Sequence, residues 1–221
     1  MFEIVQSNAR GMGMVVNPTK TQLLCIAPAN SAEVTSHIYL EDGSRIESGE
    51  EMTLLGFRFS SRPMVAAHLE LLKQKFNCRV WMLRHLRNAG IAERTVAEIY
   101  AAIIRPVVEY AVPVYHWMLN GGQSDEVEKM QRRAMKIIYG HKTSYRAALE
   151  KSALPTLKER RKNIVLKFAQ KASSSDLYDH WFPTRTYEHN TRHQKKYCEF
   201  HANTDRLYKS PLFSMRRCLN E

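Results

Sequence analysis

The spacing of apolar residues changes near Pro63, and this change limits the chain to a mixed fold with its helices in the second part. Before Pro63, short apolar runs alternate with turn-forming pairs such as Asn17-Pro18 and Asp42-Gly43, as in strands joined by turns. After it, apolar residues recur every three or four positions, as on one face of a helix. We therefore expect an α+β chain, with a small antiparallel β region followed by a mainly α-helical bundle.

The same patterns divide the chain into three parts. Residues 1–62 are predicted to form strands and turns, and residues 63–172 are predicted to form four helices. Residues 173–221 are polar, irregular and rich in histidine, which predicts a loosely ordered basic tail.

Local signals place the individual elements. In the first part we expect hairpins over residues 14–26 and 37–46 and a further strand over residues 53–59. The helices are predicted to begin near Val65, near Glu93, at the N-cap Ser124 after a Gly-Gly break, and at the capping box Thr156–Glu159. Their predicted stops are Gly90 and Gly140, and Pro106 is predicted to cause a break or a kink.

The charge of the chain is strongly positive and unevenly placed. The 33 Lys and Arg residues exceed the 22 Asp and Glu residues, giving a formal net charge of +11. Residues 1–60 hold 4 basic and 7 acidic residues, whereas residues 61–221 hold 29 and 15. A polyanion is the partner that this distribution suggests, although a solubilising surface would have the same composition.

The predicted helices carry the basic residues that could follow a nucleic-acid backbone. Aromatic residues among them, such as Trp81, Tyr139 and Tyr145, could stack on bases or sugars, or could belong to the core. The predicted backbone contacts are Lys73, Arg79, Arg84, Arg87, Arg132, Arg133, Lys136, Arg160 and Arg161.

Two further groups of residues are candidates for a reactive or metal-binding site. Lys20, at the turn after Asn17-Pro18, could reach a phosphate or protonate a pyrophosphate leaving group, or could be an exposed turn residue. The residues His189, His193, Cys198 and His201 have ligand types at a spacing compatible with zinc. Their order departs from usual zinc motifs, so we favour a solvated tail and expect no metal in this chain.

The sequence bears on cellular location only through signals that we do not find in it. The four cysteines have no paired spacing, which favours a reducing compartment, and the first residues do not resemble a secretory signal. No stretch of the sequence is long and apolar enough to predict a membrane span. We expect a protein of the nucleus or cytoplasm, not a secreted or membrane one.

The order of several motifs resembles one known family. Residues 13–21 (GMVVNPTKT) resemble the segment after the catalytic aspartates in reverse transcriptases of non-long-terminal-repeat (non-LTR) retrotransposons. Residues 54–57 (LLGF) are similar to the strand of that family that grips the primer end. Segments 99–110, 130–140 and 154–161 resemble the helical thumb that follows the palm, and residues 209–220 are similar to the C-terminal tail.

This resemblance implies specific roles. Lys20 would lie near the incoming nucleotide, Leu55, Gly56 and Phe57 would contact the primer end, and the helices would hold an RNA–DNA hybrid. The chain itself contains no Asp-Asp pair, and the family's pair, with its Mg²⁺ ions, would lie upstream of Met1. We therefore expect a palm remnant and thumb that does not polymerise unaided and that could join a separate catalytic polymerase chain.

Two other interpretations remain open from the sequence. The chain could be a non-catalytic helical nucleic-acid-binding protein derived from a mobile element, with no polymerase partner. It could also be the product of a pseudogene that folds poorly, since half a palm would expose a sheet edge and apolar surface.

Overall fold

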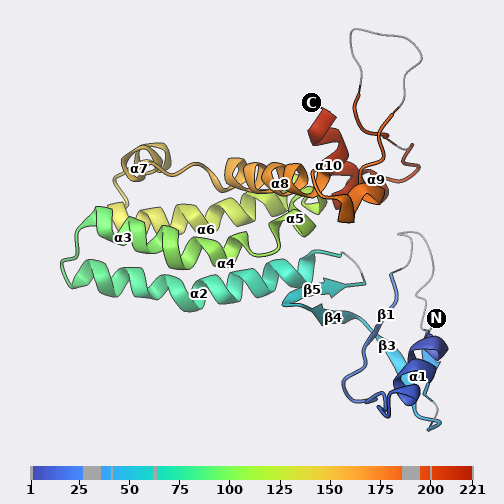
Figure 1. The fold of residues 1–221 in the computed structure, drawn as a ribbon. Coiled ribbons are helices and arrows are strands. Elements are labelled where there is room, and N and C mark those ends of the chain that lie inside the picture. Colours follow the sequence, from blue (N-terminus) through green and yellow to red (C-terminus); the bar gives the residue numbers. More distant parts are fainter. Residues whose placement is uncertain are drawn as a thin grey trace. The chain divides into compact units, whose positions relative to one another are not determined.

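A computed structural model describes residues 2–26, 36–40, 42–61, 64–185, 195–199 and 201–220. It has the mixed α+β content expected from the sequence, with small sheets and many helices (Figure 1). The chain folds as two compact units, Met1–Leu71 and Leu72–Glu221, and each unit is described by itself.

Among its described residues, the first unit contains one complete short helix and five short strands. Strand order in the three-stranded sheet is β1-β3-β2, and β4 and β5 form a separate hairpin. The elements are α1 (Phe2–Gly11), β1 (Leu23–Leu24), β2 (His37–Tyr39), β3 (Arg45–Gly49), β4 (Glu51–Leu54) and β5 (Phe57–Ser60).

The N-terminal residues differ from the prediction of strands and turns, because residues 2–11 form α1. The helix has Glu3 in its first turn and Arg10 in its last, which are the positions where those charges favour a helix. It buries Gln6 toward the rest of the unit. The local charge pattern therefore supported a helix that we did not predict.

The hairpin predicted over residues 14–26 is wrong. The Asn17 side chain accepts hydrogen bonds from the Thr19 backbone N–H at 2.9 Å and from its hydroxyl at 2.7 Å, which closes a compact turn. Val15 is exposed and pairs with none of the described strands, while Leu23–Leu24 pairs in parallel with β3. The three-stranded sheet is therefore mixed, with β1–β3 parallel and β2–β3 antiparallel.

The other hairpin predictions had different outcomes. The hairpin around Asp42-Gly43 is confirmed, with Tyr39 paired to Arg45. The strand predicted over residues 53–59 is instead a second hairpin, whose turn is Leu55-Gly56 with φ of 49° and 78°. Glycine tolerates that backbone, but leucine seldom adopts it, so the turn was hard to predict from these residues.

The core of the first unit forms where β5 meets the first residues of α2 (Ala66–Asn88). Phe57 is buried and stacks on His68 with ring centroids 4.1 Å apart. The Arg58 backbone N–H donates to His68 Nδ1 at 3.4 Å. Val65 and Leu69, on either side of His68, are buried as well, so this small core includes the start of α2.

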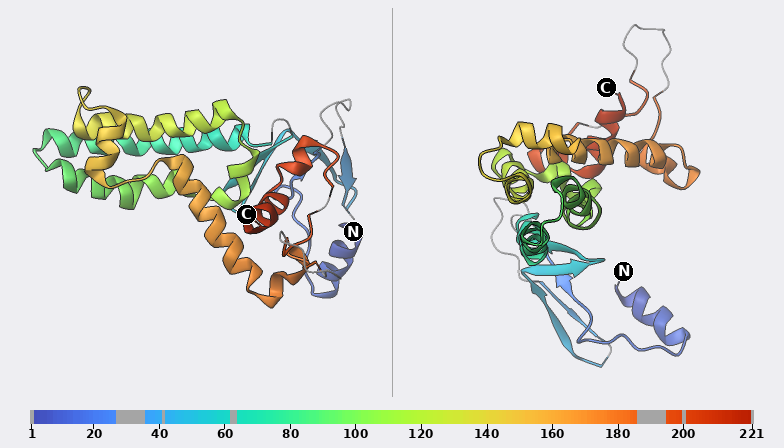
Figure 2. Two further views of the ribbon diagram at one scale, coloured as in Figure 1. Left: turned by 90° about the horizontal axis from the view of Figure 1, so that it is seen from above. Right: turned by 90° about the vertical axis from the view of Figure 1, so that its left-hand side faces the viewer.

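The second unit is a helical bundle. Helices α2, α3, α4 and α6 run alongside one another, as both views in Figure 2 show. Its further elements are α3 (Glu93–Ile99), the π-helix η1 (Tyr100–Ile104), α4 (Arg105–Glu109), α5 (Val112–Tyr115), the 3₁₀ helix η2 (His116–Met118), α6 (Gly121–Tyr139), α7 (Tyr145–Ser152) and α8 (Leu157–Ser173).

The predicted apolar stripe of α2 is confirmed and supplies one side of the bundle core. Its side chains from Leu72 onward are at most 2% exposed at the core positions. Apolar residues buried in this way on α2, α3 and α6 are Leu72, Phe76, Val80, Leu83, Val96, Val127, Ala134 and Ile138.

Most helix ends follow the sequence signals. Gly90 and Gly140 have φ of 80° and 82° just after α2 and α6, and Thr156 and Glu159 form the predicted capping box. The predicted cap Ser124 is wrong, because Asn120 caps α6 and forms a capping box with Gln123. The helix consequently starts at Gly121 and includes the two glycines that we expected to precede it.

The helical run does not break at Pro106, where we expected a break or kink, but continues through it to Glu109. Proline has no N–H to bond the preceding turn, and the residues just before it form the π-helix η1 in place of regular α-helix. Ala111, with φ of 58°, then redirects the chain into α5. The predicted second helix is therefore three consecutive segments, α3, η1 and α4.

The C-terminal region differs from the predicted loosely ordered tail. It contains η3 (Asp176–Trp181), α9 (Asp205–Tyr208) and α10 (Pro211–Asn220), and α10 contacts α8, η2 and α5. The buried Arg216 side chain donates to Trp181 O at 2.6 Å and lies 3.5 Å from Cys198 O. Met215 and Cys218 of α10 are also buried, so this segment belongs to the second unit's core.

Candidate nucleic-acid interface

A stripe of four exposed cations runs along α6. Lys129, Arg132, Arg133 and Lys136 are spaced by three, one and three residues, which places them on one side of the helix. The opposite side carries the buried core residues of the helix, such as Val127. The stripe therefore points away from the core, and we call these four residues the α6 stripe.

Helix α2 lies beside the stripe and extends the charged surface. Arg133 Nη1 donates to Asn77 Oδ1 at 2.7 Å, and Lys73 Nζ lies 2.9 Å from Glu126 Oε2. Arg84 is two helical turns beyond Asn77 on the same side of α2 and is exposed. Among the described residues, Arg84 has no carboxylate within ion-pair distance.

Five of the nine predicted cations are brought together in this way. Lys73, Arg84, Arg132, Arg133 and Lys136 all belong to the surface formed by α2 and α6. Lys129 was missed, although its position three residues before Arg132 was a usable signal.

The remaining four predicted cations serve other contacts. Arg79 lies on a different side of α2 and donates to Lys75 O at 3.0 Å. Arg87 donates to Ile91 O at 2.8 Å and pairs with Glu93, which ties the end of α2 to the next helix. Arg160 pairs with Glu109. Arg161 is buried, so it is a wrong prediction for a backbone contact.

The aromatic residues near the stripe differ in their accessibility. Trp81 is 53% exposed, and its ring meets His85 edge-on with centroids 4.6 Å apart. Tyr145 and Tyr139 instead carry cations above their rings, Arg132 at 5.2 Å and Lys151 at 5.9 Å. Trp81 is therefore the aromatic side chain best placed to meet a ligand on this surface.

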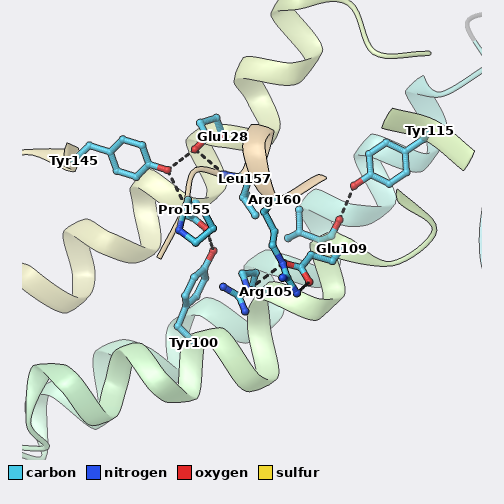
Figure 3. A network of polar contacts seen from close by, with 11 residues as sticks. Tyr100, Arg105, Glu109, Tyr115, Glu128, Tyr145, Pro155, Leu157 and Arg160 are labelled. Atoms are coloured by element: carbon cyan, nitrogen blue, oxygen red, sulfur yellow. Dashed lines mark hydrogen bonds and ion pairs between the residues drawn. The ribbon is translucent and has the colours of Figure 1, made fainter. Parts of the chain in front are cut away.

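Polar contacts buried under α6 hold the stripe in place (Figure 3). The Tyr100 hydroxyl donates to Gln131 Oε1 at 3.0 Å, and Gln131 Nε2 donates to Pro155 O at 2.9 Å. The Tyr145 hydroxyl donates to Glu128, which also accepts the Leu157 N–H at 3.1 Å. Burial, followed by the hydrogen bond to Glu128, raises the pKa of Tyr145, so this phenol remains a donor.

A second buried group, also in Figure 3, fixes α4 against α8. Glu109 Oε1 lies 3.1 Å from Arg105 Nε and 2.9 Å from Arg160 Nε, and Glu109 Oε2 accepts from Arg160 Nη2 at 3.3 Å. The Glu109 side chain is 12% exposed and the Arg105 side chain 15%. One carboxylate therefore pairs with two guanidinium groups at a largely dry position.

The candidate residues of the first unit lie on its surface or in its core. Lys20 is exposed in the turn that Asn17 closes. Leu55 is 86% exposed at the tip of the β4–β5 hairpin beside Gly56, whereas Phe57 is buried. Leu55 and Gly56 are thus accessible to a ligand, and Phe57 supports the hairpin from within.

The proposed zinc ligands fall partly outside the described residues, since His189 and His193 lie there. Cys198 Sγ is 3.5 Å from Thr184 O, and His201 Nδ1 is 2.7 Å from Asn203 Oδ1. Within the described ranges, no three His, Cys, Asp or Glu residues are arranged to hold a metal ion. None of the described helices combines the length and hydropathy needed to cross a bilayer.

No protein-family model, no curated protein and no solved structure matches this chain. The candidate interface therefore rests on the residues and contacts described above.

Proposed function

We propose that the helical unit binds the sugar–phosphate backbone of an RNA–DNA hybrid through the α6 stripe and Arg84. The observation that carries this proposal is the α6 stripe itself, four exposed cations on one side of a helix whose other side is buried. From residue 129 to residue 136 the helix rises about 10 Å, roughly the axial rise of three base pairs. Such a stripe suits several consecutive phosphates of one strand.

The chemistry of these residues favours backbone binding over base recognition. Exposed Lys and Arg side chains on a convex helix face can meet phosphates without entering a groove. Trp81 adds a surface on which a base or sugar could stack at the side of the stripe. We expect binding that depends strongly on salt and weakly on nucleotide sequence.

In this proposal the chain acts as a thumb-like, primer-template-holding part of a retrotransposon reverse transcriptase. Lys20, Leu55 and Gly56 are exposed or lie at an exposed turn, which is compatible with contacts to nucleotide and primer. Catalytic aspartates and their Mg²⁺ ions would come from a polymerase region that is not in this sequence. The alternative, a nucleic-acid-binding protein without a polymerase partner, would use the same surface.

We predict that reversing two charges of the stripe weakens hybrid binding. Lys129→Glu with Lys136→Glu should lower the affinity for a labelled RNA–DNA hybrid about 100-fold at low salt and reduce the salt slope by about two, because two phosphate contacts are lost. Fluorescence anisotropy across a salt series measures both quantities.

The matched control reverses two exposed lysines of α8, in the variant Lys167→Glu with Lys171→Glu. It changes the net charge by the same amount and should lower affinity by less than about threefold. Equal losses in the two double variants would show that net charge matters and that the stripe is not the binding surface.

A further inference from the structure

A cavity of about 690 Å³ lies in the second unit at the N-terminal end of α6. Its walls come from η2, the first turn of α6, the start of α8, and the segment from α9 to α10. None of its described lining residues belongs to the α6 stripe, so the cavity is a separate feature of the molecule. Its volume lies within the usual range of sites for small molecules.

Cationic side chains dominate the charge of this cavity. Lys158, Lys209 and Arg217 line it, against the single carboxylate of Asp125 among the described lining residues. Lys209 pairs with Asp205 at 2.7 Å, and Arg217 Nη2 donates to Tyr208 O at 2.9 Å. The Lys158 ammonium has no ion pair within the described part of the chain, so its charge is available to a ligand.

A fourth cation lies directly behind the cavity wall. Arg161 is 1% exposed, and its Nη2 donates to Ser124 Oγ, in the cavity lining, at 2.7 Å. Its Nε and Nη1 are buried without a hydrogen-bond partner, and no described carboxylate forms an ion pair with it. The charge of Glu128 acts on this guanidinium without forming an ion pair with it. A buried guanidinium with no ion-paired carboxylate is costly, so this arrangement favours an anion nearby.

The Ser124 hydroxyl can connect Arg161 to a ligand through hydrogen bonds. Its oxygen accepts from Arg161, and the described residues offer no acceptor for its own hydroxyl hydrogen. The hydroxyl can therefore donate into the cavity. Asn120 and Gly121, at the N-terminal end of the 19-residue α6, also line the cavity, and the Asn120 side chain caps this end by accepting the Gln123 N–H at 2.8 Å.

The pKa of His116 is also affected by the positive charges around the cavity. It lines the cavity, and burial, followed by the charges of Arg161, Lys158 and Lys162, lowers its pKa to about 4. The imidazole is therefore neutral at physiological pH and adds no charge of its own. A bound anion would oppose these cations and raise the pKa of His116.

We propose that this cavity binds a phosphate monoester, held by Lys158, Arg217 and the Ser124 hydroxyl. A phosphate monoester carries close to two negative charges at neutral pH, which matches several cations better than a single carboxylate would. The cavity is larger than a phosphate group, so the group attached to the phosphate has room beside Trp117. This site does not depend on the proposed hybrid binding.

Calorimetric titration of the full chain with adenosine 5′-monophosphate, at constant ionic strength, tests the proposal. We expect saturable binding of the monophosphate and none of adenosine. Lys158→Gln should weaken binding about tenfold, because a charge-assisted contact is lost. Lys167→Gln, the same change at an exposed lysine of the same helix, should leave it unchanged.

Ser124→Ala provides an independent check, because it removes the hydroxyl relay with little change in size. It should also weaken monophosphate binding, and titration of His116 by NMR should show its pKa rising with ligand in the wild-type chain. No binding of the monophosphate, or equal affinity in Lys158→Gln and Lys167→Gln, would overturn the proposal.

The source of the phosphate is distinguished by a second pair of ligands. If the natural ligand is a strand end, a 5′-phosphorylated oligonucleotide should bind more tightly than its 5′-hydroxyl form, and Lys158→Gln should abolish that difference. If it is a free small molecule, adenosine 5′-monophosphate should show the Lys158 dependence while the two oligonucleotides bind alike. Both results support the cavity as a phosphate site.

Discussion

Glu109→Gln is expected to lower the free energy of unfolding of the helical unit by about 3 kcal/mol, the lower end of the range for broken buried ion pairs. The substitution keeps the size of the side chain and removes its charge. Arg105 and Arg160 would then lie close together with no carboxylate between them. We expect the lower end because the Arg160 side chain is 37% exposed and water can partly solvate it.

The matched control is Glu150→Gln, which breaks the exposed Arg146–Glu150 pair. Its side chains are 93% and 67% exposed, so the loss should be below about 0.5 kcal/mol. Urea denaturation followed by circular dichroism measures both variants. If Glu109→Gln were as mild as Glu150→Gln, the buried group in Figure 3 would not hold α4 against α8.

Glu128→Gln is expected to lower the free energy of unfolding by about 2 to 3 kcal/mol. The reason is that the new amide N–H₂ group, a hydrogen-bond donor, would face a buried N–H group, which is also a donor. Glu128 accepts the Tyr145 hydroxyl and the backbone N–H groups of Leu157, at 3.1 Å, and Lys158, at 3.0 Å. A glutamine has only one acceptor oxygen, so its amide would oppose one of these N–H groups. It also removes a negative charge from the N-terminus of α8.

Glu159→Gln provides the comparison at the same helix end. Glu159 accepts from the Thr156 N–H at 3.1 Å in an exposed capping box, and glutamine serves equally well there. Its cost should be below about 0.5 kcal/mol by thermal or urea denaturation. Similar costs for Glu128→Gln and Glu159→Gln would contradict the buried network as a support of the α6 stripe.

Helix ends were the part of the fold that the sequence predicted best. These ends depend on local backbone conformation and on hydrogen bonds between residues close in sequence, so distant residues have little effect on them. The examples are Gly90, Gly140 and the capping box Thr156–Glu159. The same logic applied to Asn120 and Gln123, three residues apart, but the intervening Gly121-Gly122 resembled a break. A glycine in the first helical turn is tolerated when the cap beside it is strong.

Strand predictions failed where contacts with residues distant in sequence determine the structure. Residues 14–16 and 21–26 are apolar enough for a hairpin, yet the Asn17 turn and parallel pairing with β3 prevail. At Leu55 the backbone adopts a conformation that leucine alone would not suggest. Pairing with β3 depends on a partner distant in sequence, which local propensity does not contain.

The sequence predicted which types of residue form the candidate site, but it did not predict which of those side chains lie together on one surface. Arg160 and Arg161 are neighbours of the same type, yet one pairs with Glu109 and the other is buried behind Ser124. About 100° of rotation on the helix separates their environments. The α6 stripe, by contrast, follows from helical spacing, which would also have identified Lys129.

The most direct test of the proposed function is binding of the purified chain to a labelled RNA–DNA hybrid across a salt series, with primer extension assayed in the same tubes. The account predicts affinity that falls steeply with salt, with a slope of about 4.5 if each stripe cation and Arg84 contacts one phosphate, and no primer extension. Absence of hybrid binding at low salt would contradict the proposed interface. Extension that persists through further purification would contradict the proposal that catalysis needs another polymerase region.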